Sequence, residues 1–143
     1  MAKLGRYSAQ RRKIQSITES YSATAADCGT LFILNVASGC TLTLPSVASA
    51  GNGWWCKVII GTNCASNTYI ITENTSADTN VLVSSINELE TDTTEDGPSN
   101  TGHTTITFAN ALDTKGDFVE INCDGTNFYC HGQVALDGSA TLA

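Results

Sequence analysis

The sequence is poor in the residues that build catalytic and metal centres. It has only two histidines, His103 and His131, and neither lies in a triad or a metal-binding motif. No Cys-x2-Cys pair occurs, which argues against a zinc site. Cys130 and His131 are adjacent, but neighbours in a strand point to opposite faces. We therefore expect no enzymatic activity, no metal and no cofactor.

Long apolar runs are also missing. The longest, such as 58–60, are far too short to span a bilayer, and no apolar signal region follows the N-terminus. We expect no membrane partner and assembly in a cytosol, where thiols stay reduced. The cysteines are then expected to be free, small buried hydrophobes, with disulfides formed after cell lysis left open and Cys123 and Cys130 as one candidate pair. These six residues are Cys28, Cys40, Cys56, Cys64, Cys123 and Cys130.

Cations are scarce after residue 18. Residues 19–143 contain only two, Lys57 and Lys115, but all 14 acidic residues. Residues 1–18 carry a net +5 with no acid, and the remainder carries −12. The first 20 residues hold too little apolar surface to fold alone, so we predict a basic arm that an acidic partner orders. The acidic body opposes specific nucleic-acid binding. The expected docking residues of the arm are Lys3, Arg6, Tyr7, Arg11, Arg12 and Lys13.

Period-2 patterns predict that the body, residues 21–134, is all-β. Cys40, Leu42 and Leu44 alternate with Thr41 and Thr43, which is typical of a strand with one buried face. The short strands and abundant turns indicate an antiparallel β-sandwich or barrel-like domain with an extended N-terminal arm and an extended tail, 135–143. Strands are expected over 29–36, 40–44, 54–60, 69–72, 81–86, 104–108, 116–123 and 128–134, with a helical turn within 46–53.

A long acidic loop, 87–102, interrupts the strand pattern. It lacks the Asp-x-Asp-x-Asp-Gly spacing of a calcium loop. It is either a solvated outward loop that keeps particles soluble or a docking surface for a neighbour's basic arm. Its acidic residues are Glu88, Glu90, Asp92, Glu95 and Asp96.

Two adjacent tryptophans, Trp54 and Trp55, point to opposite sides of one expected strand. One of them belongs in the core. The other lies either under a loop of the same subunit or at a subunit interface, where tryptophan is enriched.

Two stretches carry a resemblance to a known kind of domain. The first, 29–55, runs from a strand through Gly-Cys-Thr-Leu-Thr-Leu-Pro (39–45) to Gly-Asn-Gly-Trp-Trp (51–55). The second joins Gly-Asp-Phe-Val-Glu (116–120) to Cys-Asp-Gly-Thr-Asn-Phe-Tyr (123–129). Together they resemble the β-sandwich module of tailed-bacteriophage structural proteins, which occurs in capsid decoration (cement) proteins and in tail-fibre domains, often as trimers.

The resemblance implies a structural protein of a virion. The short chain and its basic arm favour a decoration protein that stabilises the outer shell by binding the major capsid protein through the arm. It would form a homo-oligomer, with a homotrimer favoured, on the capsid exterior. The alternative is a tail-fibre or receptor-binding module that recognises a host surface glycan or protein.

Overall fold

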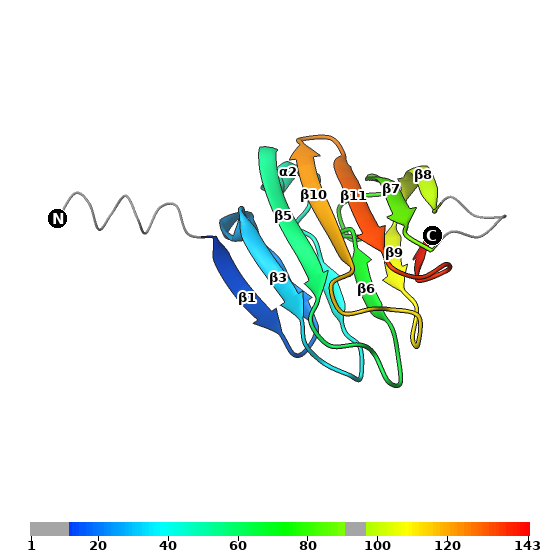
Figure 1. The fold of residues 1–143 in the computed structure, drawn as a ribbon. Helices are drawn as coiled ribbons and strands as arrows, with labels where there is room; N and C mark the ends of the chain where they lie inside the picture. The colour runs from blue at the N-terminus through cyan, green and yellow to red at the C-terminus, as the bar shows by residue number, and fades with distance from the viewer. Residues whose placement is uncertain (1–11, 91–96) are drawn as a thin grey trace, which may run out of the picture.

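Two β-sheets packed face to face form the molecule. The structure, a computed structural model, describes residues 12–90 and 97–143 (Figure 1). The larger sheet has seven strands in the spatial order β1 (Lys13–Ile17), β3 (Thr30–Leu34), β5 (Asn52–Ile60), β10 (Phe118–Asp124), β11 (Phe128–Val134), β7 (Leu82–Glu88) and β8 (Ser99–His103). The smaller has five, in the order β12 (Ala140–Leu142), β9 (Thr105–Phe108), β6 (Tyr69–Thr72), β4 (Thr41–Thr43) and β2 (Tyr21–Ser22). The prediction of an all-β sandwich is confirmed.

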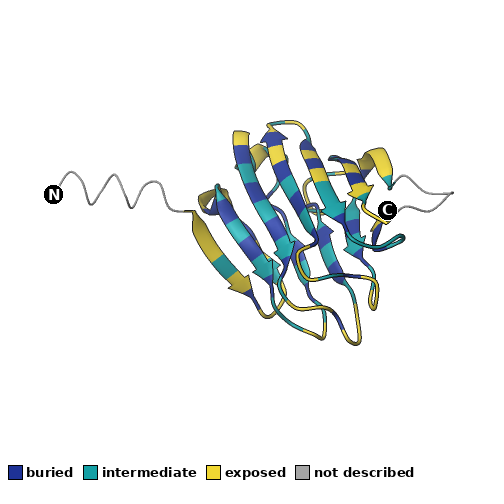
Figure 2. Cartoon of the chain, in the orientation of Figure 1, coloured by how far each residue is buried: buried dark blue, intermediate teal, exposed yellow. Residues whose placement is uncertain are grey.

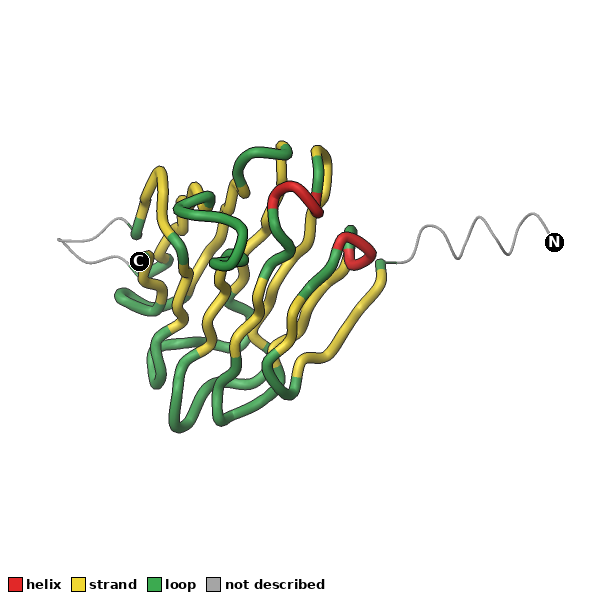
Figure 3. Tube along the Cα trace, turned by 180° about the vertical axis from the view of Figure 1, so that it is seen from behind, coloured by secondary structure: helices red, strands yellow, loops and turns green. Residues whose placement is uncertain are grey.

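Two short helical segments join the strands. The 3-10 helix η1 (Ala25–Asp27) follows β2, and α2 (Val47–Ala50) is the helical turn expected within 46–53. The Ser46 side chain caps α2 by accepting a hydrogen bond from the Ser49 N–H. Both segments lie at one end of the sandwich (Figure 3). In the described ranges no helix is long and apolar enough to cross a membrane.

The chain alternates between the sheets through its first six strands. Strands β1, β3 and β5 pair in parallel in the larger sheet, while β2, β4 and β6 pair in parallel in the smaller one. Antiparallel pairing enters only later, where β7 pairs with β8, where β10 joins β5 to β11 and where β9 joins β6 to β12. The sheets are therefore mixed, and the expected antiparallel pairing holds for only part of each sheet. Sequential hairpins cannot produce this arrangement, because parallel neighbours need a connection that leaves the sheet and returns.

The boundaries of three predicted segments also change. The arm was expected to reach residue 20, but Lys13–Ile17 form β1 and pair with β3. Part of the expected tail, Ala140–Leu142, is strand β12. Within the expected loop, β7 runs to Glu88 and β8 begins at Ser99. Each shift has the same cause, since short polar segments become strands when a neighbouring edge satisfies their backbone groups.

The core lies between the sheets, and Figure 2 shows buried and less buried residues alternating along the large sheet. Phe32, Val58 and Ile121 from the larger sheet and Leu42 and Ile71 from the smaller are fully buried. The period-2 prediction for 40–44 is confirmed, because the three apolar residues are buried and the two threonines are half-exposed. Burying a side chain of this size contributes about 1.5–3 kcal/mol.

A buried tyrosine joins two loops to the core. The Tyr69 hydroxyl accepts a hydrogen bond from the Val36 N–H at 3.0 Å. Its hydrogen faces the carbonyl oxygens of Val36 and Thr62, each 2.8 Å from the phenolic oxygen. Burial raises the pKa of Tyr69 to about 12, so the hydroxyl stays protonated and able to donate. Nearby, Gly39 packs so closely that a Cβ would lie 2.4 Å from the Thr68 carbonyl oxygen, at a φ of +74°.

Replacing this hydroxyl should destabilise the fold. Tyr69→Phe removes the hydrogen bonds that the hydroxyl makes with the Val36 N–H and with the carbonyls of Val36 and Thr62, which costs about 1–3 kcal/mol in the free energy of unfolding. Urea denaturation measures this loss. Tyr129→Phe, on a side chain that is 39% exposed, is the matched control and should change stability by less than about 0.5 kcal/mol. Equal effects of the two substitutions would contradict the role of Tyr69.

Candidate functional site

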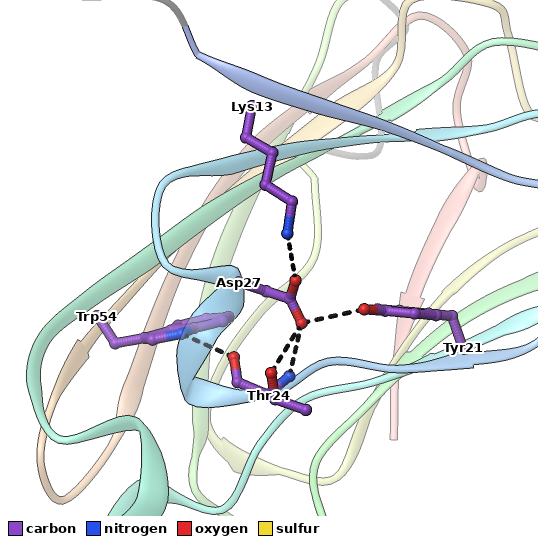
Figure 4. Close-up of polar contacts among 5 residues, drawn as sticks. All are labelled: Lys13, Tyr21, Thr24, Asp27 and Trp54. Carbon is purple, nitrogen blue, oxygen red and sulfur yellow. Dashed lines mark hydrogen bonds and ion pairs between the residues drawn. The ribbon is translucent and has the colours of Figure 1, made fainter. Parts of the chain in front are cut away.

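The junction between the basic arm and the body is built around Asp27. The Lys13 ammonium lies 2.7 Å from Asp27 Oδ1, with the lysine side chain 54% exposed and the aspartate 5%. The other carboxylate oxygen, Oδ2, accepts hydrogen bonds from the Tyr21 hydroxyl at 3.1 Å and from the Thr24 N–H at 2.9 Å and hydroxyl at 3.1 Å (Figure 4). These residues come from β1, β2 and the start of η1, so one carboxylate joins three consecutive parts of the chain.

The charges at this junction stabilise each other. Burial alone raises the pKa of Asp27, but the hydrogen bonds from Lys13, Thr24 and Tyr21 outweigh it, and the net pKa is lowered. The hydrogen bond to Asp27 raises the pKa of Lys13. Both groups therefore stay ionised near neutral pH, and β1 is held against the rest of the sheet by charge as well as by backbone pairing.

The side chains of Trp54 and Trp55 point to opposite faces of β5, as those of neighbouring residues in a strand do. Trp54 is buried, packs edge-on against Phe128 with ring centroids 5.9 Å apart, and donates its indole N–H to the Thr24 carbonyl at 3.3 Å. Trp55 lies on the outer face of the large sheet, half-buried. Gly29 lies against its ring, and the Arg12 guanidinium carbon is 5.4 Å from the ring centroid. Trp54 is thus the core residue of the pair, and a subunit interface at Trp55 stays one of the two predicted alternatives.

Two of the predicted docking cations are thus bound to the body. Arg12 contacts Trp55, and Lys13 is paired with Asp27. The other expected docking residues, Lys3, Arg6, Tyr7 and Arg11, lie outside the described residues.

The acidic residues of the expected loop that the structure describes contact the C-terminal part of the chain. Glu88 Oε1 accepts a hydrogen bond from the Gly138 N–H, and Glu90 Oε2 accepts one from the Asp137 N–H, both at 3.2 Å. Asp92, Glu95 and Asp96 lie outside the described residues.

The histidines have unlike surroundings. His131 is exposed on the outer face of the large sheet, whereas His103 is buried. His103 Nδ1 lies 2.9 Å from the Thr105 carbonyl oxygen, and Nε2 lies 2.7 Å from Ser84 Oγ. Because a carbonyl only accepts, Nδ1 carries the hydrogen, and the Ser84 hydroxyl donates to Nε2. Sequence reasoning missed this serine–histidine contact, since β7 and β8 must pair to create it; both side chains are sealed in the core.

The cysteines are all free thiols. Five of the six are buried, and Cys28 is exposed. Burial raises the pKa of Cys130 to about 12, which disfavours its reactive thiolate. Cys123 lies opposite Phe128 and Cys130 opposite Ile121, so the pair considered for post-lysis oxidation does not meet across the hairpin. Across 12–90 and 97–143, no three His, Cys, Asp or Glu side chains cluster closely enough to hold a metal.

A second surface, which sequence reasoning did not single out, lies on the outer face of the large sheet. Two adjoining hollows of about 310 and 250 Å³ share Phe118 and Gln133 in their walls. The only sequence signal was the alternation along 116–123 and 128–134, which gives the outward positions but not which of them are neighbours.

Comparison with known protein families, with curated proteins and with solved structures finds no match for this chain.

Removing the Asp27 carboxylate should destabilise the junction. Asp27→Ala leaves the Thr24 and Tyr21 donors unpaired and should lower the free energy of unfolding by about 1–3 kcal/mol at pH 7. Because the folded pKa is lowered, this stabilisation is full above the unfolded value and is lost as pH falls through the folded one. Urea denaturation across acidic pH measures it. Lys13→Gln should lower the free energy of unfolding by less than Asp27→Ala does, and should shift the acid unfolding transition to higher pH. Lys115→Gln should change neither quantity. An Asp27→Ala protein as stable as wild type would refute this role.

His103 should make stability depend on mildly acidic pH. Burial lowers its pKa below the ordinary value of 6.5, so the unfolded chain binds a proton first as pH falls. The free energy of unfolding should decrease as the pH falls from about 6.5 to the pKa of His103 in the folded protein. Below that pKa, His103 should add nothing further to the pH dependence. Thermal denaturation of wild type and His103→Gln at several pH values isolates the contribution. His131→Gln is the exposed control and should follow wild type.

Proposed function

We propose that this chain is a structural protein of a virion, a capsid decoration protein that binds the outer shell through its basic N-terminal segment and stabilises it. The observation that carries the proposal is the position of the cations. Arg12 and Lys13 attach the N-terminal segment to the rim of the acidic sandwich, and Lys3, Arg6 and Arg11 precede this attachment in the sequence.

Because the N-terminal segment is basic and the body is acidic, the segment can bind an acidic partner that the body would repel. The body repels anionic surfaces, so an acidic patch on a capsid subunit would attract only the basic segment. Eleven residues span at most about 40 Å when extended, which is enough to reach beyond the footprint of one small domain. Charge-assisted hydrogen bonds would then form across neighbouring capsid subunits.

Strand β1 offers a second contact at the same rim. It is the outermost strand of the large sheet, and its Ile14 side chain is 63% exposed (Figure 1). An edge strand presents backbone N–H and C=O groups to which a strand of another chain can add. The basic segment and β1 together would therefore bind a partner through charge and through backbone hydrogen bonds.

Association into a homotrimer would strengthen binding. Three linked segments bind as coupled events, so the apparent affinity for a lattice exceeds that of one segment by orders of magnitude. A tail-fibre or receptor-binding module is the alternative function. The two differ in copy number, because decoration places many copies on the head and a fibre tip places few on the tail.

Neutralising the basic segment should abolish shell binding without unfolding the protein. In the triple variant Lys3→Gln, Arg6→Gln, Arg11→Gln, the Asp27 junction and β1 remain intact. Co-sedimentation with shells of the parent virus that lack this protein measures binding. We expect wild type to saturate the shells, with affinity falling as salt rises, and the variant to remain in the supernatant.

A matched control removes charge from the body instead. Lys57→Gln with Lys115→Gln takes away two cations distant from the junction in sequence and should bind shells as wild type does. Deletion of residues 2–11, which spares β1, should match the triple variant. Unchanged saturation by either arm variant would contradict the proposal.

A further inference from the structure

The outer faces of the two sheets differ in chemistry. On the smaller sheet the outward positions of β4, β6 and β9 are threonines apart from Ile70, and we call Thr41, Thr43, Thr72, Thr105 and Thr107 the threonine face. On the larger sheet the outward positions of β10 and β11 carry aromatic, amide and charged side chains, and both hollows lie along these strands. The outward positions of β3, the end of β5 and β7 include the aliphatic residues Leu31, Ile33, Ile59 and Val83. A scaffold that only needed solvation on both sides would not require this asymmetry.

The first hollow crosses three strands. Phe118, Gln133 and Asn87 are cross-strand neighbours on β10, β11 and β7, and Glu120 and His131 form the next row. Asn122 follows on β10. Cross-strand neighbours lie about 5 Å apart and successive rows about 7 Å apart, so the polar groups form a regular grid over the hollow.

None of these polar side chains is used by the fold. In the part of the chain that the structure describes, no side-chain hydrogen bond or ion pair involves Asn87, Glu120, Asn122, His131 or Gln133. Two other side-chain amides do form hydrogen bonds within the fold. The Asn67 side chain donates to the Ser38 carbonyl, and Asn100 Oδ1 accepts from the Gly102 N–H. The grid therefore retains its full capacity to bind an outside molecule.

Phe118 supplies an apolar wall at the centre. The Lys57 ammonium lies 4.0 Å from its ring centroid, which is a cation–π contact. The second hollow continues past this wall to Leu89, which is 59% exposed, and to Lys115. We call the two hollows together the Phe118 groove. Its two compartments fit an elongated molecule with repeating units.

We infer that the Phe118 groove binds a neutral oligosaccharide. Sugar hydroxyls are both donors and acceptors, which the side-chain amides and the imidazole match, and the apolar face of a sugar ring can pack on Phe118. The Glu120 carboxylate disfavours an anionic group in the first hollow, and the cations near the groove, Lys57 and Lys115, lie at Phe118 and in the second hollow. A peptide would bind better at a sheet edge than on a face, because its backbone needs edge hydrogen bonds.

This inference does not depend on docking through the basic segment, and either can fail alone. Its test is an NMR titration of the full-length, isotopically labelled protein with neutral tetrasaccharides built from glucose, mannose, galactose or N-acetylglucosamine. An open, shallow site predicts a Kd on the order of 1 mM, so the titration extends to about 10 mM. We expect at least one tetrasaccharide to shift amide signals of 118–122 and 131–133 and to leave the threonine face unchanged.

Gln133→Ala removes a side chain shared by both hollows and should weaken binding roughly three- to tenfold, the effect of losing one or two hydrogen bonds. Thr107→Ala on the threonine face is the matched control and should bind as wild type does. The inference is overturned if no tetrasaccharide shifts groove signals, if Gln133→Ala binds unchanged, or if a sialylated tetrasaccharide binds better than the neutral ones. It is equally overturned if sedimentation shows that Gln133→Ala dissociates an oligomer, because the groove would then be covered by a second copy.

Discussion

The facing surfaces of the two sheets must be buried together, because the chain crosses from one sheet to the other at most of its connections. Through the first six strands successive crossings add strands to the two sheets in turn, so neither sheet can be completed alone. Phe32 in one sheet and Leu42 in the other are fully buried, and each depends on the opposite layer for that burial. Polar groups caught at the crossings must be satisfied locally, which explains the buried Asp27 carboxylate between β2 and β3 and the Tyr69 hydroxyl between two loops.

Asp27 links this architecture to the charge distribution. Its carboxylate holds β1 through Lys13, so the basic N-terminal segment begins at a defined place on the rim of the sandwich. A buried carboxylate without a cation would be costly, and the hydrogen bonds from Thr24 and Tyr21 reduce that cost further. The same contacts divide the cations of the sequence into those that complete the fold and those that precede it. The second group, Lys3, Arg6 and Arg11, is the one available to a partner in the proposed function.

The outer faces of the two sheets carry different side chains, so the molecule has two chemically distinct sides. Threonine fits a solvated strand surface, since its branched side chain suits the strand and its hydroxyl can bind water. The opposite face carries Phe118 and Trp55, each contacted by a cation from the same chain, Lys57 and Arg12. These contacts cover part of each ring. A virion protein attached by one rim would leave such a face open to its surroundings, where a glycan could reach it.

The sequence by itself determined eight of the strands, because burial on one face of a strand leaves a period-2 pattern, as in Cys40–Leu44, and because turn residues such as Asp124–Asn127 end strands locally. The four edge strands, β1, β8, β12 and β2, were not predicted. The sequence also determined that Trp54 and Trp55 point to opposite faces of their strand, and that positive charge is concentrated at the start of the chain. Only the tertiary structure decided which strands are neighbours, since parallel pairing across alternating sheets leaves no mark on a single strand. For the same reason the Asp27 junction, the Ser84–His103 contact and the Phe118 groove could not be predicted: each joins side chains that are distant in sequence and that meet only when the sheets are complete.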